Sequence, residues 1–316
     1  MSQLTIPLVG PGKNIDRDRW GRPLIIPPDG GDPVAYTRCT TYVSALDDKK
    51  NLMGWNARMV ALGLAQRDDL LLKVRATDPG DKKTLGAITE EAADFAGAHR
   101  RAEIGTQIHA LTERLDRGET VPDAGEYQAD LDAYREALDE RGIIPTEIET
   151  FVVNDYLKIG GTFDRIYTVN GRKYIGDIKT GEKLDYGVNT FAMQLAVYAN
   201  SLRYDWQTGR RTPLDVDRTW AILIHLPAGE GTATVYWLDI EKGWQGVGLA
   251  QGVRAWRDMK KNAFIHPCSV PLTWQVEHAE TLDELYALYD MNASQWTPRL
   301  TELAAQRKTT LTGQVG

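Results

Sequence analysis

Cysteine is scarce in this sequence of 316 residues, which contains only Cys39 and Cys268. Two thiols so far apart in the chain cannot build a disulfide framework. They also cannot supply the four ligands of a structural zinc or iron–sulfur site within one chain. We therefore expect two reduced thiols and no iron–sulfur cluster.

Long apolar runs are missing as well. No stretch approaches the roughly 20 consecutive apolar residues that a membrane-spanning helix needs. The first residues, MSQLTIPLVGPGKN, lack the basic and then apolar layout of a secretory signal. A GxxxxGK[ST] phosphate-binding loop is also missing, which argues against an ATP-driven motor. The sequence therefore predicts a cytoplasmic protein with neither a membrane nor ATP as a partner.

The sequence also has no surplus of positively charged residues. Lys and Arg number 37 against 44 Asp and Glu, which gives a formal net charge of −7. Proteins that bind nucleic acid usually neutralise phosphates with surplus Lys and Arg, so the charge argues against such a partner. A local basic groove can still exist on an acidic protein, and carboxylates around a metal ion lose much of their repulsion for DNA. Net charge alone therefore does not exclude DNA.

The composition itself is that of a folded globular protein, with 42% hydrophobic and 26% charged residues. No long Pro/Gly/Ser-rich or single-sign linker divides the chain. We therefore predict one elaborated domain over residues 1–316. It comprises an N-terminal arm and helices (1–83), a catalytic core (84–240) and C-terminal helices with a tail (241–316).

Hydrophobic periodicity predicts the order of the elements. Six prolines in residues 1–35 favour an irregular arm, and residues 306–316 should be frayed. The predicted elements are helices over 42–66, 84–117 and 125–141, strands over 146–153, 159–169 and 172–180, a helix over 187–204, strands over 218–226 and 232–240, and helices over 243–261 and 280–290.

The candidate catalytic residues lie in residues 160–181, GGTFDRIYTVNGRKYIGDIKTG. Asn170-Gly171 is a strong hairpin signal between two strands. Because side chains alternate along a strand, Asp177 and Lys179 must point to the same side. The hairpin can bring Asp164 beside them, so two carboxylates and one ammonium would share one small site.

This grouping suits phosphodiester hydrolysis. Carboxylate oxygens hold Mg²⁺, for which Mn²⁺ can substitute, and the metal activates a bound water. A neighbouring lysine can orient that water. Taken singly, each of these residues is more often an ordinary surface charge. The apolar context IGDIKTG weakens that interpretation, because a buried acid needs compensation and a metal ion provides it.

The sequence resembles the RecB-type nucleases of the PD-(D/E)XK, or restriction-endonuclease-like, superfamily, over roughly residues 100–200. The blocks that carry the resemblance are Gly105-Thr106-x-x-His109, Gly161-Thr162-x-Asp164, Asp177-x-Lys179-Thr180-Gly181 and Gln194-Leu195-x-x-Tyr198. The resemblance implies an α/β fold with an αβββαβ core and a mixed central sheet. A mostly helical N-terminal region and C-terminal helices would flank this core. The scarcity of cysteine separates the chain from the branches with iron–sulfur clusters, so the resemblance is to stand-alone, phage-type members.

The resemblance also implies roles for individual residues. The expected metal ligands are His109, Asp164, Asp177 and the backbone carbonyl of Ile178, and the expected catalytic residues are Asp164, Asp177, Lys179 and Gln194. Gln194 would position Lys179 or the scissile phosphate. For His109 to reach the site, its helix must approach the sheet closely along the Gly105 side. Supporting roles are expected for Glu113, Glu149, Thr162, Arg165, Thr180 and Tyr198, with Thr162, Arg165 and Thr180 contacting phosphate or the residues around the metal.

The sequence therefore predicts a magnesium-dependent deoxyribonuclease. Exonuclease action is expected because no base-reading module is appended. Its substrate would be single- or double-stranded DNA with free ends in phage recombination, repair or DNA processing, and a recombination or single-strand-binding protein is a further expected partner. Arg100, Arg101, Arg210, Arg211, Lys260 and Lys261 are candidates for the DNA track. Two alternatives remain open: a DNA-binding or recombination scaffold that does not cut, and a magnesium enzyme acting on a small phosphorylated substrate.

Overall fold

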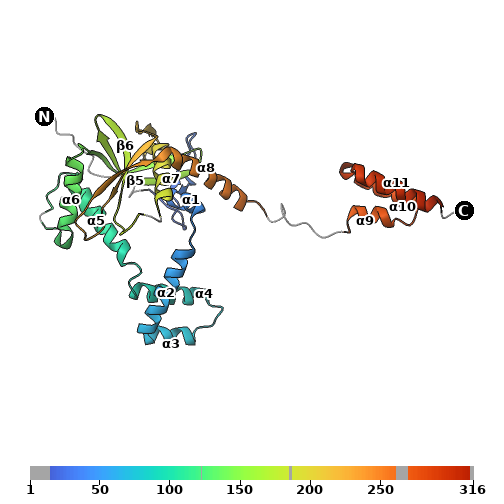
Figure 1. The fold of residues 1–316 in the computed structure, drawn as a ribbon, viewed down its shortest axis with the longest axis horizontal. Coiled ribbons are helices and arrows are strands. Elements are labelled where there is room, and N and C mark those ends of the chain that lie inside the picture. Colours follow the sequence, from blue (N-terminus) through green and yellow to red (C-terminus); the bar gives the residue numbers. More distant parts are fainter. Residues whose placement is uncertain (1–14, 122, 185–186, 261–269, 314–316) are drawn as a thin grey trace. The chain divides into compact units, whose positions relative to one another are not determined.

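A computed structural model describes residues 15–121, 123–184, 187–260 and 270–313 (Figure 1). Residues 1–14 of the predicted arm, Lys261, Cys268 and the last three residues lie outside these ranges. The chain divides into two compact units, 1–257 and 258–316, where the sequence predicted one domain. The second unit buries a hydrophobic cluster of its own, which includes Val276, Leu285 and Leu300. A separate cluster allows a short segment to form a compact unit without joining the larger core.

The first unit is built on a mixed sheet. Over the described residues the sheet has eight strands, in the order β10-β9-β6-β5-β4-β7-β8 with β3 paired to β5. The β3–β5 and β6–β9 pairs are parallel and the others are antiparallel. The strands are β3 (Thr37–Arg38), β4 (Ile144–Asn154), β5 (Ile159–Val169), β6 (Arg172–Lys179), β7 (Leu202–Tyr204), β8 (Arg211–Pro213), β9 (Trp220–His225) and β10 (Thr234–Asp239). A separate two-stranded sheet joins β1 (Leu24–Ile25) to β2 (Val34–Ala35).

The hairpin between β5 and β6 forms where the sequence predicts it. Val169 pairs with Arg172, and Asn170 and Gly171 form the turn with φ values of +49° and +79°. Positive φ at both positions is the requirement that Asn-Gly meets at low cost. This turn fixes the register of the two strands that carry Asp164 and Asp177.

The helices differ from the prediction at several boundaries. The expected helix over 84–117 is two helices, because Gly97 adopts φ +88° and ends the first of them. The segment after Ala199 turns into β7 instead of continuing the predicted helix. Helices of the first unit are α1 (Cys39–Val43), α2 (Lys50–Gln66), α3 (Asp68–Ala76), α4 (Lys82–Phe95), α5 (Arg100–Asp116), α6 (Gln128–Asp139), α7 (Val188–Ala199) and α8 (Ile240–Arg257), with 3₁₀ turns η2 (Ser44–Leu46) and η3 (Gly125–Tyr127).

The second unit is helical. It contains α9 (Leu272–His278), α10 (Leu282–Asn292), the 3₁₀ turn η5 (Ala293–Gln295) and α11 (Pro298–Gly313). The prediction that residues 306–313 are frayed is wrong, since α11 continues to Gly313 and Arg307 bonds to the carbonyl of Ala279. Within the described parts of both units, no helix combines the length and the apolarity needed to cross a membrane.

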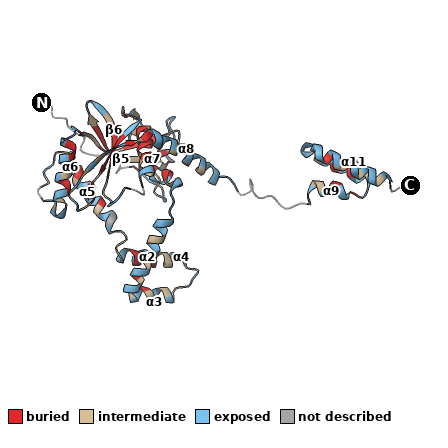
Figure 2. Cartoon of the chain, in the orientation of Figure 1, coloured by how far each residue is buried: buried red, intermediate tan, exposed pale blue. Residues whose placement is uncertain are grey.

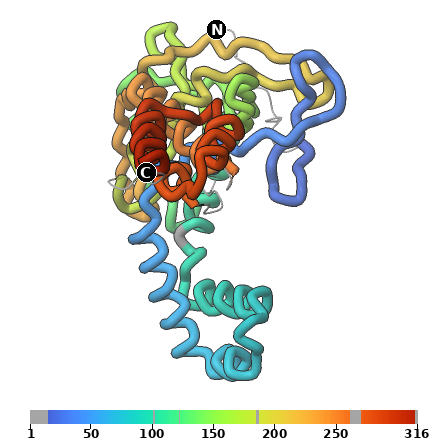
Figure 3. The backbone as a smooth tube through the Cα atoms, turned by 90° about the vertical axis from the view of Figure 1, so that its right-hand side faces the viewer, coloured from blue at the N-terminus to red at the C-terminus, as the bar shows by residue number. Residues whose placement is uncertain are grey.

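Both faces of the sheet are covered. On one face, α1, α7 and α8 pack over a cluster that includes Phe163, Ile175 and Leu223. On the other, α5 and α6 pack over a cluster that includes Tyr167, Ile178 and Ile222. Figure 2 shows the buried residues concentrated in the central strands and α7. Helices α2, α3 and α4 form a group with a small cluster of their own (Figure 3). The central strands are therefore buried on both faces.

Candidate active site

The candidate site lies where β5 and β6 separate. Their pairing extends from the hairpin turn to Arg165 and Gly176 and ends there. From Gly176 onwards β6 pairs with β9 instead, as far as Lys179 opposite His225. Asp164 and Asp177 are the first residues beyond the last β5–β6 pair. The opening between the two strands gives room for polar side chains in the middle of an otherwise apolar sheet.

Asp164 occupies this opening and links three elements. Its Oδ2 accepts a hydrogen bond from the backbone N–H of Ile178, at 3.3 Å. The same oxygen lies 3.3 Å from Nδ1 of His109 on α5. Strand β5, strand β6 and helix α5 therefore meet at one carboxylate. The expected role of the Ile178 backbone carbonyl as a metal ligand stays a prediction.

Gly105 lets α5 come this close. A Cβ atom at this position would lie 2.9 Å from Oγ1 of Thr180, the residue that follows β6. That spacing is shorter than van der Waals contact allows, so a side chain here would force either α5 or the Thr180 side chain to shift. The close approach expected at Gly105 is present, and it places His109, one helical turn later, against Asp164.

Asp177 and Lys179 lie together on β6, as strand alternation predicts. Lys179 Nζ is 2.7 Å from Asp177 Oδ2, and the Asp177 side chain is only 4% exposed. The Asp177 Oδ2 atom nevertheless accepts no directed hydrogen bond within the described structure. The Lys179 ammonium also lies 4.6 Å from the ring centroid of Phe191 on α7, a cation–π distance.

The electrostatics of the site are unusual for carboxylates. Burial, reinforced by the nearby charge of Asp164, raises the pKa of Asp177 to about 7, although Lys179 and Arg165 oppose the shift. Burial lowers the pKa of His109, and the Asp164 charge only partly offsets this. At neutral pH the imidazole is therefore uncharged, which is the form that binds metals. A partly protonated Asp177 is the response of a buried carboxylate that lacks a full counter-charge.

These residues fit a divalent cation by their chemistry. Two carboxylates and one neutral imidazole surround the opening, and one carboxylate oxygen is buried without a directed hydrogen bond. However, no three His, Cys, Asp or Glu side chains within the described ranges already converge as a metal site. Asp177 Oδ2 is paired with Lys179 at 2.7 Å, so a metal bound through this oxygen would have to open that pair.

The structure excludes a phosphate contact for Arg165. Its side chain is fully buried, with Nε 2.6 Å from Asp116 Oδ2 on α5 and Nη1 donating to the backbone carbonyl of Asp164. Tyr134 on α6 donates to the same Asp116 carboxylate. Arg165 instead ties the strand of Asp164 to the helix of His109. Glu113 forms an ion pair with Arg117 at 3.3 Å, and its charge also acts on the nearby His109 in the direction that raises the imidazole pKa.

Glu149 sits at a conformationally strained position. It has φ +51° within β4, between the pairs Ile148–Arg165 and Thr150–Phe163, and so lies opposite Asp164. A non-glycine residue in the left-handed region costs about 1–3 kcal/mol, and such positions cluster at functional sites. Glu147, by contrast, forms a bidentate ion pair with Arg203 on β7 and is held away from the site.

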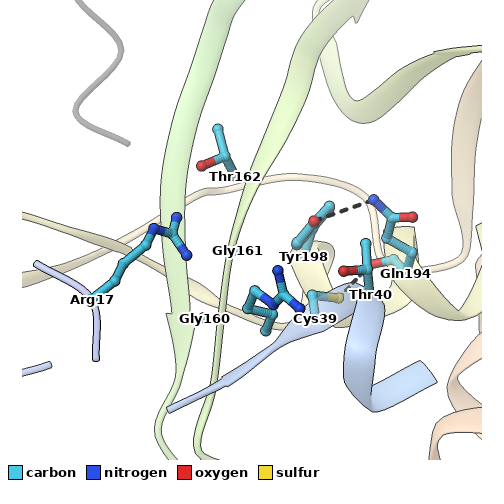
Figure 4. Close-up of a pocket in the computed structure, with 9 residues that line it drawn as sticks. Arg17, Cys39, Thr40, Gly160, Gly161, Thr162, Gln194 and Tyr198 are labelled. Carbon is cyan, nitrogen blue, oxygen red and sulfur yellow. Dashed lines mark hydrogen bonds between the residues drawn. The ribbon is translucent and has the colours of Figure 1, made fainter. Parts of the chain in front are cut away.

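Three further predicted residues, Thr162, Gln194 and Tyr198, line a pocket beside the carboxylates (Figure 4), and Thr180 is not among its lining residues. Gln194 donates from Nε2 to the hydroxyl of Tyr198, at 3.2 Å, and contacts neither Lys179 nor the carboxylates by a hydrogen bond in the described structure. Burial raises the pKa of Tyr198 well above 10, so its hydroxyl stays protonated. The pocket has a volume of about 240 Å³. Its lining residues are Arg17, Arg38, Cys39, Thr40, Gly160, Gly161, Thr162, Gln194 and Tyr198.

Sequence reasoning missed Arg17, Arg38 and Asp116. Arg17 and Arg38 lie more than 120 residues before Asp164 in the chain, and β3 joins β5 through two parallel pairs, Thr37–Ile159 and Arg38–Gly160. No local motif signals such a contact. Among the basic residues predicted for a DNA track, Arg211 is excluded, because it pairs with Asp155 at 2.8 Å and is largely buried.

Comparison with known proteins gives little further information. No family model matches the sequence, and no curated protein matches it. The chain is similar to a solved structure described as the crystal structure of SSO0001, with 16% sequence identity and a TM-score of 0.23. That likeness covers 63% of this chain and 82% of the other. A TM-score this low supports no conclusion about fold family or function.

Proposed function

We propose that this protein is a magnesium-dependent deoxyribonuclease with a restriction-endonuclease-like core that acts from DNA ends. The observation that carries the proposal is the meeting of the buried Asp177 with the partly exposed Asp164, Lys179 and His109 at the β5–β6 opening. Strongly shifted pKa values cluster at functional sites, and burial raises the pKa of Asp177 to about 7. The order α6, β4, β5, β6, α7, β9 also supports an αβββαβ core, to which the three-residue strands β7 and β8 are added between α7 and β9.

The division of roles follows from the geometry. Asp164, Asp177 and His109 would hold the metal, which when bound polarises the phosphate and lowers the pKa of a water molecule. Lys179, at the edge of the carboxylates, can donate hydrogen bonds to the attacking water or to a nonbridging phosphate oxygen. Phe191 packs beside the ammonium and restricts its position. Gln194 and Thr162 belong to the wall along which the strand would pass.

Cleavage of end-labelled single- and double-stranded DNA, followed on gels with Mg²⁺, Mn²⁺ or EDTA, tests the proposal. We expect products with either metal and none in EDTA. Lys179→Ala should slow cleavage about 100-fold or more, the usual size of a positioned acid–base contribution. Lys173→Ala is the matched control, because Lys173 lies on the same strand at the hairpin end.

Four outcomes would refute the proposal. Cleavage in EDTA, or wild-type rates with Lys179→Ala, would remove the metal or the lysine from the chemistry. DNA binding without any cleavage would indicate a recombination scaffold. Hydrolysis of nucleotides with no effect on polymeric DNA would indicate an enzyme of small phosphorylated substrates.

A further inference from the structure

Strand β10 forms an open edge of the central sheet. It stands at one end of the strand order and pairs with β9, in a continuous register over Thr234–Asp239. Alternate residues of an antiparallel strand point their N–H and C=O groups away from the partner strand, so half of β10 offers these groups outwards. In the described chain, the backbone of residues 234–238 forms no hydrogen bond outside the β9 ladder. The outer edge of β10 can therefore accept another strand.

The opposite edge of the same sheet is protected, whereas β10 is not. That edge is β8, which is three residues long, contains Pro213 and holds Arg211 in an ion pair with Asp155. Short length, proline and charge are common means by which proteins keep edge strands from pairing with other chains. Strand β10 is six residues long, TVYWLD, with neither proline nor lysine, and its pairing with β9 has no bulge. It therefore lacks these protective features.

Aromatic side chains extend this open edge into an apolar surface. Trp237 is 53% exposed and Tyr236 is 44% exposed, on opposite faces of the strand. The Trp237 ring packs edge-on against Tyr174 of β6, with 4.9 Å between centroids. Trp220 of β9 is 42% exposed and lies on the same face as Trp237, because it pairs with Asp239 two residues further along β10. Exposed apolar surface of this kind marks an interaction site.

A second copy of the same chain fits this surface. A two-fold axis perpendicular to the sheet would pair β10 antiparallel with its copy and continue both faces of the sheet. The axis would pass at Tyr236 or Trp237, so that this aromatic residue faces its own copy, a favourable cross-strand pair. Asp239 would then lie opposite Ala233 or Val235, and not opposite the other Asp239. Like charges therefore do not meet along the paired strands, although each whole chain carries a net charge of −7.

We propose that β10 joins two copies of this chain into a dimer with one continuous sheet. Each of the three half-exposed aromatic residues, Trp220, Tyr236 and Trp237, can bury roughly 100 Å². With the backbone of the paired strands, the interface reaches about 1,000 Å² in total, the lower end for a specific complex, so the dimer should form at micromolar concentration. Strands β9 and β6 separate β10 from the β5–β6 opening. The inference is therefore independent of the proposed nuclease function.

Sedimentation velocity of the full chain over a range of concentrations tests the proposal. We expect the wild type to change from monomer to dimer within the micromolar range. Tyr236→Lys/Trp237→Lys places a charge on each face of the edge strand and should weaken association by about tenfold or more. The matched control is Tyr156→Lys/Trp256→Lys, which makes the same changes at side chains that are 83% and 61% exposed, outside β10. This control should dimerise as the wild type does.

Cysteine cross-linking tests whether β10 itself forms the contact. Two-fold pairing brings the residue on the axis to about 4.5–5.5 Å from its copy, measured between Cα atoms, which is within disulfide range. Either Tyr236→Cys or Trp237→Cys should therefore give a disulfide-linked dimer on mild oxidation. Tyr156→Cys, and the wild type with its two native cysteines, should not.

A monomer at every concentration would overturn the proposal and leave β10 as a surface for an extended segment of another protein. A dimer that persists in Tyr236→Lys/Trp237→Lys, or the failure of both β10 cysteine variants to cross-link, would place the contact on another surface. Circular dichroism checks that the lysine variant is folded. If that variant does not fold, the cross-linking of the cysteine variants decides.

Discussion

Asp177 shows how a single residue can be held in a state that a folded protein ordinarily avoids. Its side chain is almost fully buried, and Lys179 does not provide Oδ2 with a directed hydrogen bond. Burial and the Asp164 charge raise the Asp177 pKa to about 7, above its ordinary value of 3.8. Without metal, the ionised form therefore costs folding free energy at neutral pH.

This shift predicts a pH-dependent stability difference in EDTA. Because the Asp177 pKa is higher in the folded state than in the unfolded state, the protonated carboxyl favours folding. This contribution to the free energy of unfolding is complete below about pH 4 and is lost as the pH rises through about 7. Asp177→Asn cannot ionise and should keep that stability. Relative to the wild type, the variant should therefore gain on the order of 3 kcal/mol between pH 4 and pH 8, measured by urea unfolding.

Added metal supplies the control for this prediction. Mg²⁺ should stabilise the wild type at pH 8 by binding only the folded state, and it should stabilise Asp177→Asn much less. A stability difference that does not change with pH would show that Asp177 is not a buried ionising carboxylate.

Arg165 stabilises the site from the protein interior. It is fully buried, pairs with Asp116 and bonds to the carbonyl of Asp164. Arg165→Met would leave the Asp116 carboxylate buried and unpaired, so we expect a loss of about 3–5 kcal/mol in the free energy of unfolding. The double variant Arg165→Met/Asp116→Leu should recover much of this loss.

Arg172→Met is the matched control for Arg165. Arg172 pairs with Asp217 on the surface, with its own side chain 71% exposed, and should lose at most about 1 kcal/mol. Equal losses at the two arginines would mean that the buried pair does not hold α5 to β5.

At the scale of elements, α5 reaches the sheet only because Gly105 has no side chain. Gly86 on α4 is a second helical glycine, and a Cβ there would meet nothing within 4 Å. Gly86→Ala should therefore stabilise the protein by about 0.5–1 kcal/mol through helix propensity.

Gly105→Ala should not show the gain in stability expected for Gly86→Ala, because its Cβ would meet Oγ1 of Thr180 at 2.9 Å. Urea unfolding of the two variants makes the comparison, and Gly105→Ala/Thr180→Ala should restore the gain by removing the hydroxyl. If Gly105→Ala were as stabilising as Gly86→Ala, close packing of α5 against the end of β6 would not be needed.

The elements around the site could be predicted from local signals. Asn170-Gly171 fixes the hairpin, and alternation along β6 places Asp177 beside Lys179. The glycine at 97 was not anticipated as a helix end, since glycine is also tolerated inside helices at a cost of about 1 kcal/mol. Strands β7 and β8 are three residues each, too short for alternation to be visible.

Long-range features of the site could not be predicted in this way. The burial of Arg165 depends on α5 and α6, which supply Asp116 and Tyr134 from distant sequence. The φ of +51° at Glu149 follows from the local path of β4 and has no signature in its residue type. Arg38 reaches the site through a two-residue parallel strand pair that no pattern indicates.

For the whole molecule, the net charge of −7 bears on how DNA is held. The two pocket arginines, Arg17 and Arg38, allow little counterion release, so the log–log salt slope of single-strand binding should be shallow, roughly −1 to −2. Ca²⁺ fills oxygen sites and would remove repulsion at Asp164 and Asp177. We therefore expect anisotropy titrations to show much tighter DNA binding in Ca²⁺ than in EDTA. Equal affinity in both, with a steep salt slope, would point to a basic groove elsewhere.

Calorimetric titration with Mn²⁺ tests the proposed metal centre most directly. We expect the wild type to bind Mn²⁺, Asp177→Ala to lose binding, and Lys179→Ala to bind largely as the wild type does while failing to cut DNA. These results would separate the carboxylates that hold the metal from the lysine that serves the reaction. Unchanged Mn²⁺ binding in Asp177→Ala, or no binding by the wild type, would contradict a metal-dependent active site at the β5–β6 opening.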